Sequence, residues 1–152
     1  MTLEIGQQAP DFTLPDQHGN MVTLSSFRGK KNVVLIMYPG DDTPGCTKQL
    51  CSVRDNFADF EALDAEVFGI NHADAGSHEK FVDKYHLKNP LLVDAGRKVI
   101  KEYGAIGNFM GHESTKRTVV IVDKAGVIVY LKQGLPSHSE LKKALETANS
   151  KQ

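Results

Sequence analysis

The chain has 152 residues, of which 40% are hydrophobic and 24% charged, and its net charge is −1 at pH 7. This length and composition predict one folded domain, residues 1–152, rather than a disordered chain. A near-neutral charge lacks the basic surface of nucleic-acid binders, and every apolar run is too short to span a membrane. No signal-peptide pattern is visible at the start, so we expect a cytoplasmic protein with reduced thiols and no nucleic-acid or membrane partner.

Hydrophobic patterning predicts alternating strands and helices along the chain. Residues 12–24 are expected to form an N-terminal β-hairpin around an Asp/Gly/Asn turn. Further strands are expected at 33–38, 66–70, 91–93, 118–122 and 127–131, and helices at about 46–63, 77–87, 97–103 and 137–149. A βαβ unit followed by an antiparallel hairpin and a final helix predicts an α/β protein with a thioredoxin-like fold, in which a central mixed sheet has helices on both faces.

The only two cysteines, Cys46 and Cys51, lie at the start of the helix predicted for 46–63. The unpaired N–H groups and the positive dipole end of a helix N-terminus favour a thiolate, which is the nucleophilic form of cysteine. On a regular helix, Cα atoms five residues apart are separated by roughly 8–9 Å, whereas a disulfide needs about 4.4–6.8 Å. A 46–51 disulfide therefore requires the helix to unwind, which is typical of a catalytic pair rather than a structural one.

The cysteines and histidines can also be interpreted as residues without a catalytic role. Either cysteine could be a small buried apolar residue. A metal site is not expected, because the cysteine spacing is not a zinc pattern and no histidine lies at ligand spacing from either cysteine. The six histidines do not cluster, and each is interpreted as a surface or helix residue; they are His18, His72, His78, His86, His112 and His138.

The residues around Cys46 carry a family resemblance. The stretch Pro39-x-x-x-Thr43-x-x-Cys46 resembles the active-site signature of the peroxiredoxins. Its extension, Thr-Pro-Gly-Cys-Thr-x-Gln-x-Cys-x-x-Arg-Asp, is similar to the peroxiredoxin Q subfamily, also called bacterioferritin comigratory protein. Similar stretches at 6–14, 77–81 and 117–123 extend the resemblance over nearly the whole chain.

The segment 104–117 is shorter than in many members of this subfamily. Within it, Ile106 stands where a tryptophan is frequent, which bears on substrate preference. Gln49 stands where many members carry glutamate, and glutamine is a common alternative there.

The resemblance implies a thioredoxin-dependent thiol peroxidase acting on hydrogen peroxide and organic hydroperoxides. Cys46 would attack the peroxide and become a sulfenic acid, and Cys51 would resolve it as an intramolecular 46–51 disulfide after local unwinding. A thioredoxin-type dithiol would then reduce the disulfide. No metal, haem, flavin or other cofactor is implied, and resolution within one chain favours a monomer.

Two residues are expected to assist Cys46 directly. Arg117, permanently charged, would stabilise the thiolate and donate hydrogen bonds to the peroxide oxygens. Thr43, three residues before the cysteine, would hydrogen-bond the sulfur or accept the peroxide proton. The alternatives are a solvated charge for Arg117 and a helix N-cap for Thr43, and the latter is compatible with catalysis.

Three further residues are assigned supporting roles. The backbone around Gly45 would bind a peroxide oxygen, and Pro39 would shield the thiolate from water. Gln49 would orient neighbouring groups one turn into the helix. Pro39 could equally be a strand terminator, and Gln49 could be a solvated surface residue.

Two other functions remain open. Cys46 could act alone, with an external thiol resolving it while Cys51 only packs. The same thiolate could serve a redox-sensing or chaperone-like binding protein. A thioredoxin-type oxidoreductase is disfavoured, because that chemistry uses a C-x-x-C pair.

Overall fold

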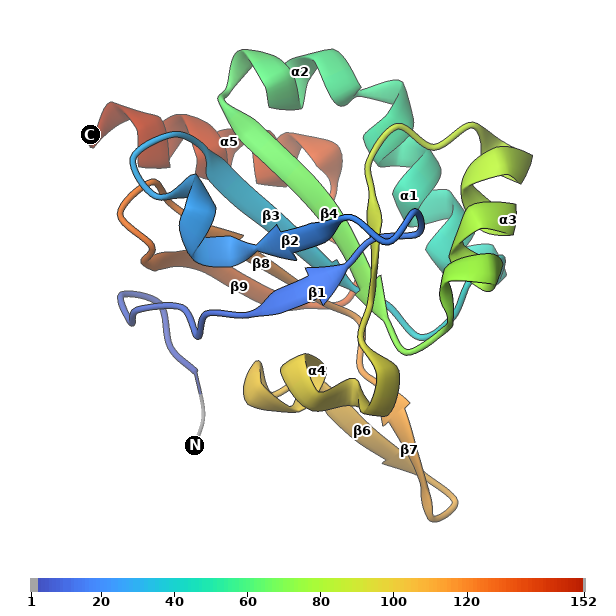
Figure 1. The fold of residues 1–152 in the computed structure, drawn as a ribbon. Coiled ribbons are helices and arrows are strands. Elements are labelled where there is room, and N and C mark those ends of the chain that lie inside the picture. Colours follow the sequence, from blue (N-terminus) through green and yellow to red (C-terminus); the bar gives the residue numbers. More distant parts are fainter. Residues whose placement is uncertain (1–2, 152) are drawn as a thin grey trace.

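A central five-stranded sheet organises the molecule, which is described here by a computed structural model covering residues 3–151 (Figure 1). The strand order is β5-β4-β3-β8-β9. The parallel strands are β3 (Asn32–Met37), β4 (Ala65–Asn71) and β5 (Leu91–Val93), and the antiparallel ones are β8 (Thr118–Val122) and β9 (Ile128–Gln133). The predicted mixed sheet is therefore confirmed, with β3 at its centre.

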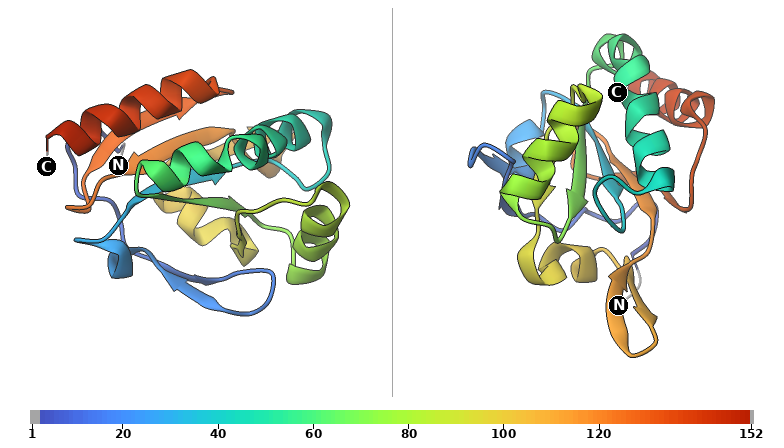
Figure 2. Two further views of the ribbon diagram at one scale, coloured as in Figure 1. Left: turned by 90° about the horizontal axis from the view of Figure 1, so that it is seen from above. Right: turned by 90° about the vertical axis from the view of Figure 1, so that its right-hand side faces the viewer.

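Every residue of β3 is buried, because both faces of the sheet are covered. Val34 and Ile36 point to the face covered by α1 (Pro44–Asp55), α2 (Phe57–Ala62) and α5 (His138–Ser150). Val33, Leu35 and Met37 point to the other face, which is covered by α4 (Lys98–Glu102) and the N-terminal residues. Figure 2 shows these layers, and the prediction of helices on both faces is confirmed.

The predicted N-terminal hairpin is present as β1 (Thr13–Pro15) and β2 (Met21–Thr23). Its turn is fixed by Asp16, whose carboxylate accepts hydrogen bonds from the backbone N–H groups of His18 and Asn20. The predicted last helix is also present, and the Ser137 hydroxyl accepts from the N–H of Glu140 at 3.2 Å. The Glu140 side chain contacts Tyr130 and Lys132 instead of completing a capping box.

The long helix expected at 46–63 is two helices, so that part of the prediction is wrong. The chain leaves helical geometry at Asn56 (φ −114°, ψ 21°), where the side-chain amide donates to the Ser52 carbonyl at 2.8 Å. Asparagine competes for backbone hydrogen bonds in this way and so tends to interrupt helices. The helix α1 therefore carries both cysteines and ends before α2 begins.

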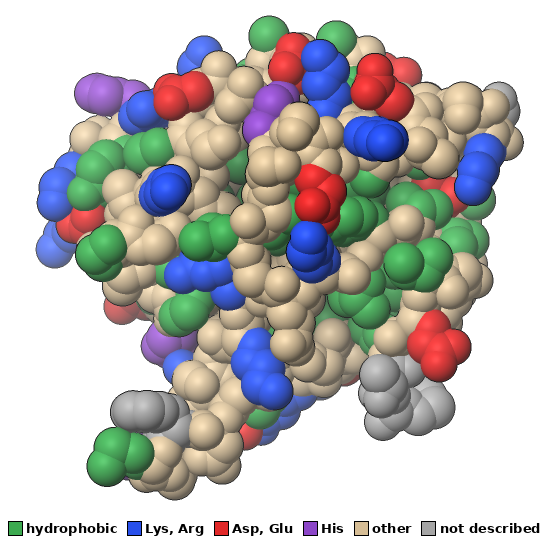
Figure 3. Space-filling view, turned by 180° about the vertical axis from the view of Figure 1, so that it is seen from behind, with side chains coloured by type: hydrophobic (Ala, Val, Ile, Leu, Met, Phe, Trp, Pro, Cys, Tyr) green, Lys and Arg blue, Asp and Glu red, His purple; other side chains and the backbone are tan. Residues whose placement is uncertain are grey.

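A second, unexpected hairpin lies between α4 and β8. It consists of β6 (Ile106–Phe109) and β7 (His112–Thr115) and projects from the body of the molecule (Figure 3, lower left). Positive φ angles at Met110 (51°) and Gly111 (80°) give its two-residue turn the handedness that hairpins favour. The other helix that contributes to the site, α3 (Ala75–Tyr85), lies beside α1 near β5. No helix in residues 3–151 has the length and apolarity needed to cross a membrane.

Candidate active site

Cys46 lies in the first turn of α1 and is 0% exposed. The turn begins with Thr43 in extended geometry at the N-cap and Pro44 at the first helical position, where its fixed φ is suited to a helix start. The first helical hydrogen bond runs from Thr47 N to Thr43 O. The N–H groups of Gly45 and Cys46 precede that bond, so the sulfur lies at the positive end of the helix dipole.

Arg117 extends over this same turn. It directly precedes β8, whose antiparallel pairing with β3 aligns Thr118 with Met37 at the end where the chain enters α1. Its Nη1 donates to Gln49 Oε1 at 2.9 Å, and its Nη2 lies 2.9 Å from the position that a Cβ on Gly45 would occupy. The guanidinium is therefore a fixed positive charge beside the first turn of α1, not a freely solvated one.

Gln49 is only 8% exposed, so its interpretation as a solvated surface residue is wrong. Its amide oxygen holds Arg117 from one turn further along α1. On its other side Gln49 borders a cavity of about 300 Å³ whose apolar lining includes Ile36, Phe60 and Leu141.

Thr43 and Pro39 are both exposed and lie in the loop that joins β3 to α1. Thr43 occupies the N-cap position, but its hydroxyl makes no cap bond and donates instead to the Gly40 carbonyl at 3.1 Å. That hydroxyl retains lone pairs that could accept a proton or hydrogen bond. Pro39 follows the last residues of the strand, as its interpretation as a strand terminator expects.

Cys51 is half-buried on α1, and both cysteines are free thiols. Because one continuous helix contains both residues, the expectation that they cannot bond in this conformation is confirmed. One turn after Cys51, the Arg54 guanidinium donates to the Tyr85 carbonyl at 2.5 Å and attaches the end of α1 to α3.

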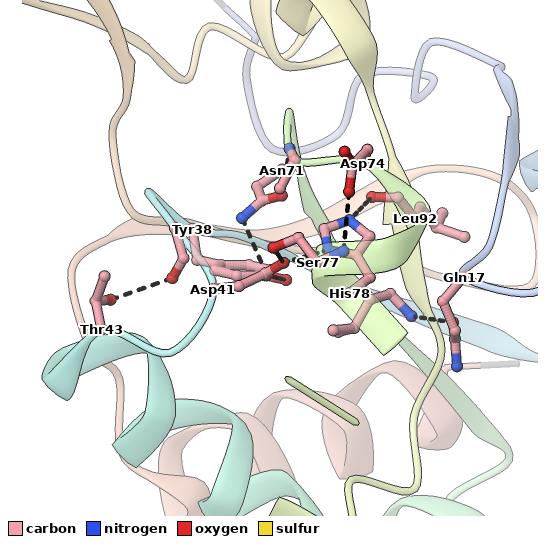
Figure 4. Close-up of polar contacts among 12 residues, drawn as sticks. Gln17, Tyr38, Asp41, Thr43, Asn71, Asp74, Ser77, His78 and Leu92 are labelled. Atoms are coloured by element: carbon pink, nitrogen blue, oxygen red, sulfur yellow. Dashed lines mark hydrogen bonds and ion pairs between the residues drawn. The ribbon is translucent and has the colours of Figure 1, made fainter. Parts of the chain in front are cut away.

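A buried polar network beside the loop was not predicted from the sequence (Figure 4). Its centre is Asp41, which accepts hydrogen bonds from four side chains: Tyr38, Asn71, Ser77 and His78. His78 is 0% exposed, so its interpretation as an ordinary surface or helix residue misses that it is a buried partner of the loop between β3 and α1. Only tertiary structure brings these residues together, because Asp41 and His78 are 37 positions apart.

The electrostatics of this network favour a charged carboxylate. Burial alone would raise the pKa of Asp41, but the hydrogen bonds from His78, Ser77 and Tyr38 outweigh it and hold the pKa below its usual 3.8. Burial, together with the Asp41 charge, raises the pKa of Tyr38 well above 10. Tyr38 therefore remains a hydrogen-bond donor. Among the described residues, no group of three His, Cys, Asp or Glu side chains is placed to hold a metal ion.

These features define a class: a thioredoxin-like domain that presents a buried cysteine at a helix N-terminus beside an arginine. A model of the AhpC/TSA family matches residues 5–131, and the chain belongs to that family. The predicted family resemblance is thereby confirmed.

The relatives agree with this membership. Chloroplastic peroxiredoxin Q of Oryza sativa subsp. japonica is 48% identical over 126 residues, which are 83% of this chain and 57% of that protein. The Arabidopsis thaliana protein of the same name is 47% identical over 123 residues, 81% of this chain and 56% of its own. The chain thus spans less than two thirds of the length of these relatives.

Solved structures agree with the fold. Peroxidoxin BcpB from Mycobacterium tuberculosis has a TM-score of 0.87 and 31% identity, with 99% of each chain covered. A cysteine-to-serine mutant of PrxQ from Xylella fastidiosa has the same TM-score of 0.87 at 22% identity, covering 99% of this chain and 98% of its own. At that identity the second match supports the fold alone.

Proposed function

We propose that this protein is a thiol peroxidase that reduces hydrogen peroxide and organic hydroperoxides through Cys46. One observation carries the proposal: Cys46 is buried at the N-terminus of α1, and Gln49 holds the Arg117 guanidinium over the same turn. The names of the relatives, peroxiredoxin Q, support the same activity.

The first step is attack of the Cys46 thiolate on the distal oxygen of the peroxide. The S–O bond forms as the O–O bond breaks, sulfur is oxidised by two electrons, and the leaving oxygen departs as water or an alcohol after taking up a proton. The first-turn N–H groups and Arg117 favour the anionic sulfur, and Arg117 donates to the oxygens as charge develops on the leaving atom.

Three neighbours complete this step. The Thr43 hydroxyl accepts the peroxide proton or hydrogen-bonds the sulfur, using the lone pairs that its bond to Gly40 leaves available. The N–H groups at Gly45 and Cys46 bind a peroxide oxygen. Pro39, at the mouth of the loop, limits access of water to the sulfur.

The second step forms the 46–51 disulfide. The Cys51 thiol attacks the Cys46 sulfenic acid, a sulfur–sulfur bond forms, and the sulfenic oxygen leaves as water. Because one helix holds the two sulfurs apart, residues of about 46–55 unwind first, and we propose that this unwinding limits the step. A thioredoxin-type dithiol then returns both cysteines to thiols and is itself oxidised to a disulfide.

The partners and compartment follow from this cycle. Resolution within one chain needs no second subunit, so the protein acts as a monomer, and light scattering of the purified protein tests this. No step uses nucleic acid or a membrane. A supply of dithiol reductant is found in reducing compartments such as the cytoplasm, which is where the protein is proposed to act.

The test is intact mass and peptide mapping after one equivalent of hydrogen peroxide, with and without dimedone. A loss of two hydrogen atoms mapped to a 46–51 link, reversed by thioredoxin, is the expected result. A dimedone adduct at Cys46 without the link would instead show that an external thiol, and not Cys51, resolves the sulfenic acid. Inertness of Cys46 would overturn the peroxidase proposal.

A Cys51→Ser variant separates the two roles. It should still form the Cys46 sulfenic acid but should lose most thioredoxin-supported turnover. Full turnover in this variant would show that Cys51 only packs.

A further inference from the structure

Asp41 lies in the loop between β3 and α1, two residues before Thr43 and five before Cys46. Its Oδ1 accepts from Tyr38 Oη at 2.6 Å and from Asn71 Nδ2 at 3.3 Å. Its Oδ2 accepts from Ser77 Oγ at 2.6 Å and lies 2.7 Å from His78 Nδ1. The carboxylate therefore ties the loop to the ends of β3 and β4 and to the first turn of α3.

His78 has a hydrogen-bond partner at each of its ring nitrogens. Its Nε2 lies 2.9 Å from the Leu92 carbonyl, which can only accept, so Nε2 carries a proton. Its Nδ1 faces an Asp41 carboxylate whose oxygens already accept from three other donors. Both ring nitrogens therefore face hydrogen-bond acceptors, and His78 and Asp41 form a buried hydrogen-bonded pair at the base of the loop.

The rest of the loop is held by more exposed contacts: the Asp42 carboxylate accepts from Lys84 Nζ at 2.7 Å and from Tyr85 Oη at 2.5 Å near the end of α3. Thr43 makes one hydrogen bond, to Gly40 of the same loop, and its side chain is exposed. Among the described side chains of the loop, that of Asp41 is the buried one that ties the loop both to the sheet and to the first turn of α3 (Figure 4). It also lies outside α1, so its hydrogen bonds can persist while α1 unwinds.

We propose that Asp41 and His78 are a positioning pair for the peroxidase: they hold the loop so that Thr43 and the first turn of α1 present Cys46 to Arg117. This inference rests on the proposed function and concerns residues that touch neither the peroxide nor the sulfur. Losing the pair lets the loop shift, and a misplacement of about 1 Å costs about 100-fold in rate. The slower step is expected to be attack of Cys46 on the peroxide, because that step needs the folded first turn of α1. The rate of disulfide formation is expected not to change, because that step takes place after α1 has unwound.

The test measures the two steps separately. In a Cys51→Ser background, hydrogen peroxide is added, samples are quenched with dimedone, and intact mass gives the rate constant for Cys46 oxidation. With Cys51 present, the same quench gives the rate of disulfide formation. Mass is the suitable readout because the chain has no tryptophan to report by fluorescence.

Three variants are compared. His78→Leu removes both donors and is expected to slow Cys46 oxidation by about 10- to 100-fold. His78→Asn keeps a donor at the Nδ1 position and should recover part of that rate. Ser77→Ala removes one donor from Asp41 and should slow oxidation by a few-fold. The matched control is His86→Asn, the same change at an exposed position that directly follows α3.

The expected pattern is slower oxidation with an unchanged rate of disulfide formation, in protein that circular dichroism reports as folded. If His78→Leu does not fold, the other two variants decide. Oxidation within twofold of the parent in both His78→Asn and Ser77→Ala would overturn the positioning role. Failure of the parent itself to form a sulfenic acid would instead overturn the proposed function.

Discussion

Replacing Gly45 by alanine should slow the reaction of Cys46 without destabilising the protein. The added Cβ would lie 2.9 Å from Arg117 Nη2. Ordinary contact begins at 3.4 Å, so the guanidinium must withdraw by about 0.5 Å. The 2.9 Å bond to Gln49 then stretches beyond the usual limit of about 3.2 Å.

The expected cost follows from this displacement. Since a misplacement of about 1 Å costs about 100-fold, half of it should cost about 10-fold, or about 1.4 kcal/mol of barrier. Stability should move the other way. Gly45 lies in α1 without a positive φ, and alanine is favoured over glycine in helices by up to about 1 kcal/mol.

The assay is quenched oxidation by hydrogen peroxide, with urea unfolding of the same samples. Gly76→Ala is a matched control, because Gly76 is also the second residue of its helix, α3, and its Cβ would meet only Asp74 Oδ1, at 3.5 Å. The control should gain similar stability with an unchanged rate. Oxidation of Gly45→Ala at the wild-type rate would refute the inference that the position of Arg117 over this turn matters.

Three other predictions concern stability and local structure. Because hydrogen bonds hold the pKa of Asp41 below 3.8, the ionised carboxylate stabilises the fold fully above about pH 4, and this stabilisation is lost as the pH falls through the lowered pKa. The free energy of unfolding of Asp41→Asn should therefore fall less steeply with decreasing pH than that of the wild type. Equal slopes would contradict this prediction. Gly69→Ala places a Cβ 2.7 Å from Leu91 Cδ2 in the core and should cost about 1–3 kcal/mol in urea unfolding; an unchanged midpoint would mean that the core relaxes freely. Oxidation to the disulfide should remove amide-exchange protection across residues 46–55 but not in α2, and identical protection in both forms would exclude unwinding.

Much of the fold could be predicted from local pattern. The strands β3, β4 and β8 are apolar runs buried on both faces, and a run of this kind can be recognised from the sequence alone. The start of α1 was equally clear, because Thr43 and Pro44 are typical of helix N-termini. These signals involve neighbours in the chain, so no tertiary knowledge was needed.

The features that the sequence did not predict have physical reasons. The break at Asn56 keeps the apolar spacing from Val53 to Phe60, so periodicity alone does not detect it. In the hairpin β6–β7, strand β7 has two exposed residues in succession, His112 and Glu113, and thus lacks the alternation that marks a half-buried strand. The pairing of Asp41 with His78, like that of Arg117 with Gln49, depends on which elements become neighbours after folding.

The break between α1 and α2 sets an end to the segment that the proposed 46–51 disulfide requires to unwind. The segment that opens can end at Asn56, because α2 has its own hydrogen bonds and buries Phe60 in the core. Opening is then a sub-global event of about a dozen residues, with a free energy well below that of full unfolding. Leu50 and Val53 would leave the core in that event, whereas Phe60 and the sheet would stay packed, so each opening would expose only part of the apolar interior.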